Sequence, residues 1–419
     1  MIKKEILSNG LTVITEKMPD VRSITLGVWL KKGSRHERPE ENGISHFIEH
    51  LLFKGTESKS GKKIALIIDS IGGQIDAFTS KEYTCFYAKI LDEHLPVALE
   101  LLSDIVLHPR LDHEDIEKER KVIYEEIKMV EDTPDELVYD IFMENFWKGH
   151  PLGNPIQGTV EKIAKITDQR LMGYFRKRYS PGNILIAAAG NLNHRKILSM
   201  VEESFGSLSG QDSQTELKAP KPHFAIVKRK KNELEQLHLC LGMDAFPRSF
   251  EERYQLLVLN TLLGGAMSSR LFQNIREKRG LAYSIFSGVN TFVDSGFLMV
   301  YAATNPGSAK EVLRLIIQEL VNLKKRLIST NELKVAKEHL KGSLMLSLES
   351  TSSRMSNIAR NELYFGRQFS LSEVLKGVDS VKAKDIQELG FRIFNNSHLT
   401  LAALGKFSKF RIRKEELEF

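Results

Sequence analysis

The sequence predicts an α+β fold built from two copies of one unit, because the same pattern of elements recurs in each half of the 419-residue chain. The first corresponding stretches are two short strand-like runs that lead into a polar loop (11–33 and 224–248), followed by a helix-like stretch (42–54 and 251–263). A strand region comes next (73–90 and 281–303), and its second copy alternates like paired strands. Helical periodicity follows in both halves, which is typical of a duplicated unit.

A change of composition separates the two copies. Residues 206–222, GSLSGQDSQTELKAPKP, are rich in glycine, serine, proline and polar side chains, and hydrophobic periodicity stops there. The sequence therefore predicts an N-terminal domain at 1–212, a linker at 213–222 and a C-terminal domain at 223–419.

The first predicted helix carries a metal-binding pattern, because His46 and His50 are four residues apart and share one face of it. Glu49 lies beside them, so the helix offers two neutral nitrogen ligands and a base for a metal-activated water. The order HxxEH is the inverted zinc motif. Such a short motif also arises by chance. Here the flanks support a helix, with an apolar stripe behind the motif and Asn42 or Ser45 as the expected cap.

A second helix is expected to supply the third ligand, since a zinc site needs ligands from more than one direction. Residues 113–131 have helical periodicity, and Glu119 and Glu126 lie two turns apart on one face. Glu126 follows His50 by 76 residues. Glu125 is the neighbouring alternative but points elsewhere. Taken alone, this segment also fits a solvated charged helix.

These spacings resemble those of the pitrilysin-type metallopeptidases, which include insulin-degrading enzyme and the mitochondrial processing peptidases, and are most similar to the processing-peptidase-like bacterial members. The resemblance implies that His46, His50 and Glu126 bind one zinc ion per chain, that Glu49 is the general base and that Glu119 supports the site. It also implies two similar domains, each a mostly antiparallel sheet packed with helices. The second copy has no HxxEH motif, so one metal site is expected.

The resemblance further implies residues that contact the substrate. Ala77, Phe78 and Thr79 resemble the family's edge strand, where an extended peptide adds as a further strand. Arg276 and Tyr283, seven residues apart, resemble the pair that reaches the substrate near the scissile bond. Without the resemblance, the arginine reads as a surface ion-pair residue and the tyrosine as a core aromatic.

Two acidic residues suggest a preference for arginine in the substrate. Glu136 and Asp140 are four apart on a predicted helix and match the family positions that select an arginine near the cleavage site. The alternative is that they are ordinary acids in the first turns of a helix, where its dipole favours negative charge.

Chain length bears on assembly, since single-chain family members are about twice as long. The resemblance therefore implies a dimer in which Arg276 and Tyr283 complete the partner's site. A homodimer is expected, and a heterodimer with an inactive homologue is the alternative.

Composition excludes other classes of protein. The chain is 42% hydrophobic and 27% charged, with a net charge of +6 and no aromatic–basic array, so a nucleic-acid partner is not expected. No apolar run reaches membrane-spanning length, so no membrane association is expected. Cys85 and Cys240, the two cysteines, are too few for a disulfide framework and indicate a reducing, cytoplasmic location.

The sequence thus predicts a zinc-dependent endopeptidase that hydrolyses peptides or presequence-like segments inside a closed chamber. Two alternatives stay open. One is a non-catalytic subunit that holds peptides, and the other is a protease dedicated to maturing one specific peptide.

Overall fold

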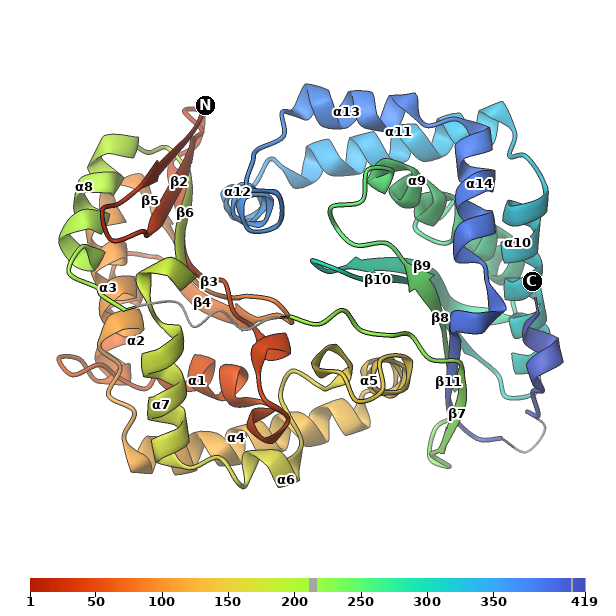
Figure 1. Cartoon of the computed structure of the whole chain (residues 1–419), viewed down its shortest axis with the longest axis horizontal. Coiled ribbons are helices and arrows are strands. Elements are labelled where there is room, and N and C mark those ends of the chain that lie inside the picture. The colour runs from red at the N-terminus through yellow and green to blue at the C-terminus, as the bar shows by residue number, and fades with distance from the viewer. Residues whose placement is uncertain (211–216, 408–409, 419) are drawn as a thin grey trace. The chain divides into compact units, whose positions relative to one another are not determined.

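The computed structural model describes residues 1–210, 217–407 and 410–418, which form two compact units (Figure 1). Unit 1 comprises Met1–Met129, Asn154–Leu217 and Ser347–Gln368, and unit 2 comprises Val130–Gly153, Lys218–Leu346 and Phe369–Phe419. Each unit therefore contains a short segment from the opposite half of the chain.

Unit 1 is built on a six-stranded sheet in the order β1-β2-β6-β3-β5-β4. Strands β2 and β6 are parallel and all other neighbours are antiparallel. The central strand β6 reads ILIAAAG and is buried along its whole length, as expected of a strand that is covered on both faces. The strands are β1 (Ile2–Ile6), β2 (Thr12–Lys17), β3 (Ser23–Leu30), β4 (Gln74–Thr79), β5 (Thr84–Leu91) and β6 (Ile184–Gly190).

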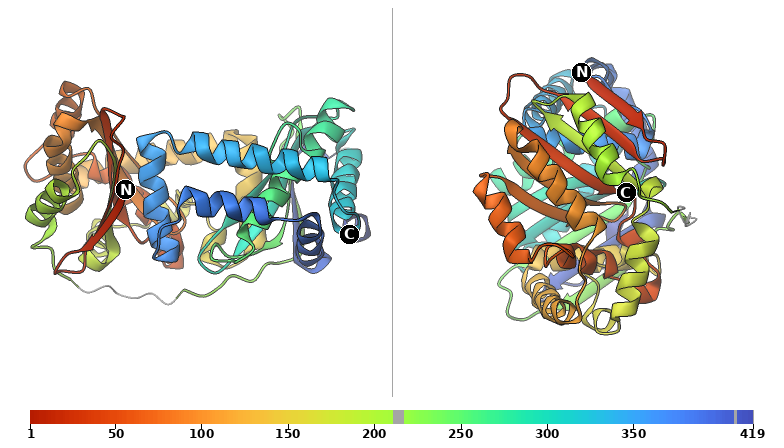
Figure 2. Two further views of the ribbon diagram at one scale, coloured as in Figure 1. Left: turned by 90° about the horizontal axis from the view of Figure 1, so that it is seen from above. Right: turned by 90° about the vertical axis from the view of Figure 1, so that its left-hand side faces the viewer.

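Helices of unit 1 cover both faces of this sheet. They are α1 (Ile44–Leu52), α2 (Gly61–Ser70), α3 (Leu95–Leu107), α4 (His113–Asp132, up to Met129 in this unit), α6 (Val160–Ile163), α7 (Asp168–Arg178), α8 (His194–Phe205) and α12 (Thr351–Phe365). Helix α12 comes from the second half of the sequence and lies beside the strands of unit 1 (Figure 2). It inserts Met355 against the sheet, where the indole N–H of Trp29 donates to the Met355 sulfur over 3.1 Å. The distant segment therefore completes the core of unit 1.

Unit 2 has a five-stranded sheet in the order β7-β11-β8-β10-β9, with β7 and β11 parallel and the other neighbours antiparallel. Without β1, the sheet of unit 1 has this same order and these directions. The predicted duplication and the α+β fold are thus confirmed. The strands are β7 (Ala225–Lys230), β8 (Leu237–Ala245), β9 (Ala282–Thr291), β10 (Gly296–Thr304) and β11 (Leu399–Gly405).

One face of the second sheet is covered by α5, which comes from the first half of the sequence. Phe142 and Phe146 of α5 pack with Phe297 in an aromatic cluster. Gly242 makes room for it, since a Cβ there would lie 2.2 Å from the Phe142 ring. The helices of unit 2 are α5 (Pro134–Phe146), α9 (Arg253–Leu263), the π-helical turn η6 (Phe272–Glu277), α10 (Ala309–Lys325), α11 (Thr330–Ser347), α13 (Leu371–Ser380) and α14 (Ala383–Ile393).

Short helical turns connect the elements: η1 (Ser34–His36), η2 (Pro39–Glu41), η3 (Asp92–His94), η4 (Pro151–Gly153), η5 (Pro181–Asn183), η7 (Asn396–His398) and η8 (Lys414–Leu417). No helix in the described ranges is long and apolar enough to span a membrane.

Two predictions differ in detail from this architecture. The predicted strand region 73–90 is a hairpin of two strands, β4 and β5, whereas the pair β9 and β10 confirms the paired strands predicted for 281–303. The predicted domains 1–212 and 223–419 are contiguous in sequence. In the structure, Ser347–Gln368 belongs to unit 1 and Val130–Gly153 belongs to unit 2. Part of the predicted linker 213–222 lies outside the described residues.

Candidate metal centre

Helix α1 carries the HxxEH residues because its opposite face is anchored in the core. Ile44, Phe47, Ile48, Leu51 and Leu52 are all buried, which fixes the rotation of the helix. His46 and His50 therefore project from the remaining face, with their ring centroids 4.6 Å apart. The predicted pairing of the two imidazoles is present.

The start of α1 differs from the prediction. The N-cap is Gly43, in the left-handed conformation with φ of 95°, and it has no side chain to cap with. Asn42 donates its amide to the Pro155 carbonyl, and the Ser45 hydroxyl lies 2.9 Å from the Tyr174 hydroxyl. The prediction that Asn42 or Ser45 caps the helix is therefore wrong, because both side chains are used by partners distant in sequence.

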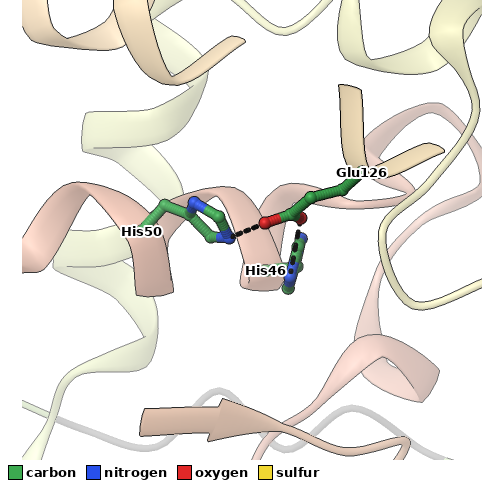
Figure 3. Close-up of side chains that lie close together, drawn as sticks. All are labelled: His46, His50 and Glu126. Atoms are coloured by element: carbon green, nitrogen blue, oxygen red, sulfur yellow. Dashed lines mark ion pairs between the residues drawn. The ribbon is translucent and has the colours of Figure 1, made fainter. Parts of the chain in front are cut away.

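Helix α4 brings Glu126 to the two histidines (Figure 3). The Glu126 carboxylate lies 3.7 Å from His46 Nε2 and 3.4 Å from His50 Nε2. One ligand atom from each of the three residues lies within 4.8 Å of the others. The neighbouring Glu125 instead pairs with Lys128 at 2.7 Å on the exposed side of α4.

Glu119, two turns before Glu126, supports His50 from behind. Its carboxylate lies 3.2 Å from His50 Nδ1 and 2.8 Å from the Lys54 ammonium, and its side chain is only 5% exposed. A carboxylate cannot donate, so the contact with Glu119 favours a proton on Nδ1 of His50 and leaves Nε2, the nitrogen nearer Glu126, as the atom that can bind a metal. An imidazole–carboxylate pair of this kind orients histidine ligands in metalloproteins.

The residues fit a zinc ion on chemical grounds. Two imidazoles and one carboxylate form a three-residue donor set of the type found in catalytic zinc sites. Two further atoms at the site, His46 Nδ1 and Glu49 Oε2, are buried and have no hydrogen-bond partner among the described residues. Buried polar atoms are normally satisfied, so an unsatisfied carboxylate oxygen beside three ligands suits a site that receives a metal, water or substrate.

Burial and neighbouring charges shift the pKa values of these groups. Burial lowers the pKa of His46 to about 4, with a smaller effect from His50, which favours the neutral imidazole. Burial also acts to lower the pKa of His50, but the hydrogen bond to Glu119 and the charges of Glu126 and Glu49 raise it overall. Burial raises the pKa of Glu49, against a hydrogen bond from Thr79. For Glu119, burial is outweighed by the hydrogen bonds from His50 and Lys54, which lower its pKa.

Strand β4 lies at the edge of the first sheet and carries Ala77, Phe78 and Thr79. Its only strand partner is β5, so the other side of its backbone has no neighbouring strand among the described elements. Thr79 reaches the carboxylate of Glu49, which ties the end of the edge strand to the metal-binding helix. The predicted edge position of these residues is present in the structure.

The other predicted substrate residues belong to unit 2. Arg276 on η6 stacks over the rings of Phe272 and Tyr283, at 4.7 and 5.6 Å from their centroids. Tyr283 is 77% exposed at the start of the edge strand β9, so it is not a core aromatic. Both residues line a pocket of about 450 Å³ with, among others, Gln236, Asn305 and Ser308. Arg276 and Tyr283 thus lie together within this unit, and their contact with a substrate stays a prediction.

Glu136 and Asp140 also belong to unit 2, one turn apart on α5. Glu136 is exposed, whereas Asp140 is half-buried. Their placement on one helix face is as predicted, and their role stays a prediction.

Sequence reasoning missed two residues that support the site. Lys54 lies two residues after the end of α1 and contacts Glu119, and its place four residues after His50 is a signal that could have been used. Glu37 holds the start of α1 although it lies six residues before the N-cap. No local sequence motif predicts such a contact.

Comparisons with known proteins agree with this geometry. The family model described as insulinase, peptidase family M16, matches residues 12–160, and the model described as peptidase M16 inactive domain matches residues 165–340. The first match covers the HxxEH motif and Glu126, and the second covers Arg276 and Tyr283.

Relatives match nearly the whole chain. The uncharacterized zinc protease YmxG of Bacillus subtilis is 44% identical over 95% of this chain and 97% of its own length. An uncharacterized zinc protease of Mycobacterium leprae is 39% identical over 98% of this chain and 93% of its own length. Among solved structures, a protease from Helicobacter pylori superposes with a TM-score of 0.90 at 25% identity, over 96% of this chain and 99% of that one. Together with the family models, these matches place the chain in the pitrilysin-type metallopeptidases, peptidase family M16.

Proposed function

We propose that this protein is a zinc-dependent endopeptidase, with His46, His50 and Glu126 as the zinc ligands. The observation that carries the proposal is the meeting of these three ligands beside Glu49, whose buried Oε2 has no hydrogen-bond partner among the described residues. The names of the relatives, which are zinc proteases, support the same chemistry. Zinc, when bound, supplies a Lewis acid that activates a water and polarises the scissile carbonyl.

Glu49 is the proposed general base and then the general acid. It lies one residue from a ligand and next to the edge strand, where a peptide carbonyl would be presented. There it accepts the proton of the attacking water and passes it to the leaving amide nitrogen. Glu119 and Lys54 keep His50 in the tautomer that directs Nε2 toward Glu126.

Strand β4 is the proposed docking edge for the substrate. An extended peptide can add to its open side, so that backbone hydrogen bonds hold the chain and do not depend on its sequence. This suits an enzyme that acts on peptides or unfolded presequence-like segments. Arg276 and Tyr283 are proposed as further substrate contacts, and Glu136 and Asp140 as the site for an arginine side chain of the substrate.

We further propose a homodimer in which the unit 2 residues of one chain complete the site of its partner. A heterodimer with an inactive homologue is the alternative. The two buried, unpaired cysteines support a reducing, cytoplasmic location.

The test is hydrolysis of quenched fluorescent peptides with and without arginine, using wild type, Glu49→Gln, Glu125→Gln and a chelator-treated sample. Glu49→Gln is expected to keep zinc and to lose a factor of about 10² to 10⁴ in kcat, because only the base is removed. Chelation should abolish cleavage, and Glu125→Gln, on the exposed side of α4, should behave as wild type.

Turnover retained by Glu49→Gln would remove this residue as the base. Zinc-loaded wild type that binds peptides without cleaving any of them would contradict the enzymatic proposal and favour a peptide-holding subunit. Equal cleavage of both kinds of peptide would contradict the proposed arginine preference.

A further inference from the structure

The metal-binding helix α1 has no cap of its own. Its N-cap, Gly43, has a φ of 95°, which L side chains rarely adopt. A Cβ at Gly43 would also lie 2.8 Å from the Gln157 carbonyl oxygen and 3.0 Å from the Gly158 Cα. These are backbone atoms that cannot rotate away. The serine, threonine or aspartate that usually caps a helix therefore has no room at this position.

Glu37 takes over this role from six residues upstream. Its Oε2 accepts hydrogen bonds from the Gly43 N–H over 2.9 Å and from the Asn42 side-chain amide over 3.3 Å. Its Oε1 accepts from the Ser45 N–H over 2.9 Å. The side chain is only 5% exposed, so both oxygens of the carboxylate are committed to the start of α1. Two of the four N–H groups that a helix start leaves unpaired are satisfied in this way.

The position of these bonds matters for the metal. Ser45 directly precedes His46, and α1 is only nine residues long. His46 is therefore in the first turn, where an uncapped helix frays, whereas His50 is held in the second turn and by Glu119. Loss of the cap would let His46 move relative to His50 and Glu126, although no ligand is changed.

We propose that Glu37 is a positioning residue of the metal site, which holds His46 in its ligating place by capping α1. The inference rests on the proposed zinc site and deepens it. Within the described residues, the hydrogen bonds of Glu37 go to Asn42, Gly43 and Ser45, so its effect acts through the start of the helix.

The experiment compares zinc affinity and the visible spectrum of the cobalt-substituted protein for wild type, Glu37→Gln and Glu37→Asp. Glutamine turns an NH₂ group toward backbone N–H donors, and aspartate is too short to bridge both of them. Each variant should bind zinc more weakly by roughly 10- to 100-fold, as outer-shell changes do. The cobalt spectrum should shift, because the geometry of the ligands changes.

Asn193→Ala is the matched control. Asn193 caps α8 in the same unit by accepting from the Lys196 N–H over 3.3 Å. Its loss should lower thermal stability without changing zinc affinity or the cobalt spectrum. Urea unfolding of every variant shows whether it is folded, so that weaker zinc binding by a folded variant can be assigned to a displaced His46. If Glu37→Gln does not fold, Glu37→Asp provides the same measurement.

Wild-type zinc affinity and an unchanged spectrum in the folded Glu37 variants would overturn the inference and leave the zinc site intact. A shift of the same size in Asn193→Ala would reduce Glu37 to an ordinary stabilising cap. Wild type that binds no zinc at all would instead overturn the proposed function, and this inference with it.

Discussion

The two units share one topology but use the same helix differently. In unit 1, α1 packs beside the edge strand β4, and in unit 2, α9 packs beside the edge strand β9. Helix α9 presents Asn260, whose side-chain oxygen accepts from the Ser287 hydroxyl over 2.8 Å. Helix α1 presents two histidines and Glu49, and leaves Glu49 Oε2 without a partner among the described residues. The polar group of α9 thus serves packing, whereas the two histidines of α1 face Glu126 and form a donor set for a metal.

This difference shows how a duplicated scaffold can separate chemistry from structure. Because the sheet order is the same in both units, each unit has one helix beside an edge strand where a functional site could form: α1 beside β4, and α9 beside β9. Among the residues that the structure describes, only the copy with His46, His50 and the facing Glu126 offers a donor set for a metal. The experiments below test whether the two copies differ in this way, from the largest expected effect to the smallest.

The first experiment asks whether the stability of each unit depends equally on the helix that comes from the other half of the sequence: α12 in unit 1 and α5 in unit 2. Phe142→Ala in α5 and Met355→Ala in α12 each remove a fully buried side chain at such an interface. Each should lower the free energy of unfolding, by about 3–5 kcal/mol for the phenylalanine and about 2–5 kcal/mol for the methionine. Urea unfolding at pH 7.5 measures both. A loss confined to one variant would show that only one unit needs its exchanged helix.

The second experiment tests the donor set on α4. Glu126→Gln removes the one anionic ligand, so zinc affinity should fall by more than the roughly 10- to 100-fold typical of outer-shell changes. Glu125→Gln, the adjacent residue that pairs with Lys128, should leave affinity unchanged. Competition with a chromophoric chelator gives both values. The reverse result would move the third ligand to Glu125.

The third experiment compares how a histidine in each unit affects the pH dependence of the free energy of unfolding. Burial, with the charges of Lys32 and Arg178, lowers the pKa of His36 in unit 1 to about 3. Between this value and about 6.5 the unfolded chain binds a proton that the folded chain does not, so stability falls as the pH falls. His36 alone should contribute a loss of about 2 kcal/mol from pH 7.5 to pH 5, and the raised pKa of the adjacent Glu37 acts in the opposite direction.

His36→Gln should remove this part of the pH dependence, and His339→Gln on the exposed side of α11 in unit 2 should not. Urea unfolding at the two pH values measures the change. An unaltered slope in His36→Gln would mean that another group causes the acid sensitivity.

Local patterns predicted the centre of the site well. The spacing of His46 and His50, and of Glu119 and Glu126, depends only on helix geometry, and the structure places these residues together. The hairpin character of 73–90 was harder to predict, because the turn residues 80–83 carry neither glycine nor proline. The start of α1 was assigned to the wrong residues because Glu37 reaches it from outside the helix. The exchange of α5 and α12 depends on contacts between distant parts of the chain, which periodicity does not report.

That exchange has a consequence for synthesis of the chain on the ribosome. The first sheet is complete once β6 has emerged, but the apolar side chains of Trp29 and Ile14 are covered only when Met355 and its helix arrive. About 160 residues separate β6, which ends at Gly190, from α12, which begins at Thr351, so at about 5–20 residues per second this surface is open for roughly 10–30 s. We expect the nascent chain to need shielding during this interval, and the metal-binding unit to become fully folded only after α12 has emerged.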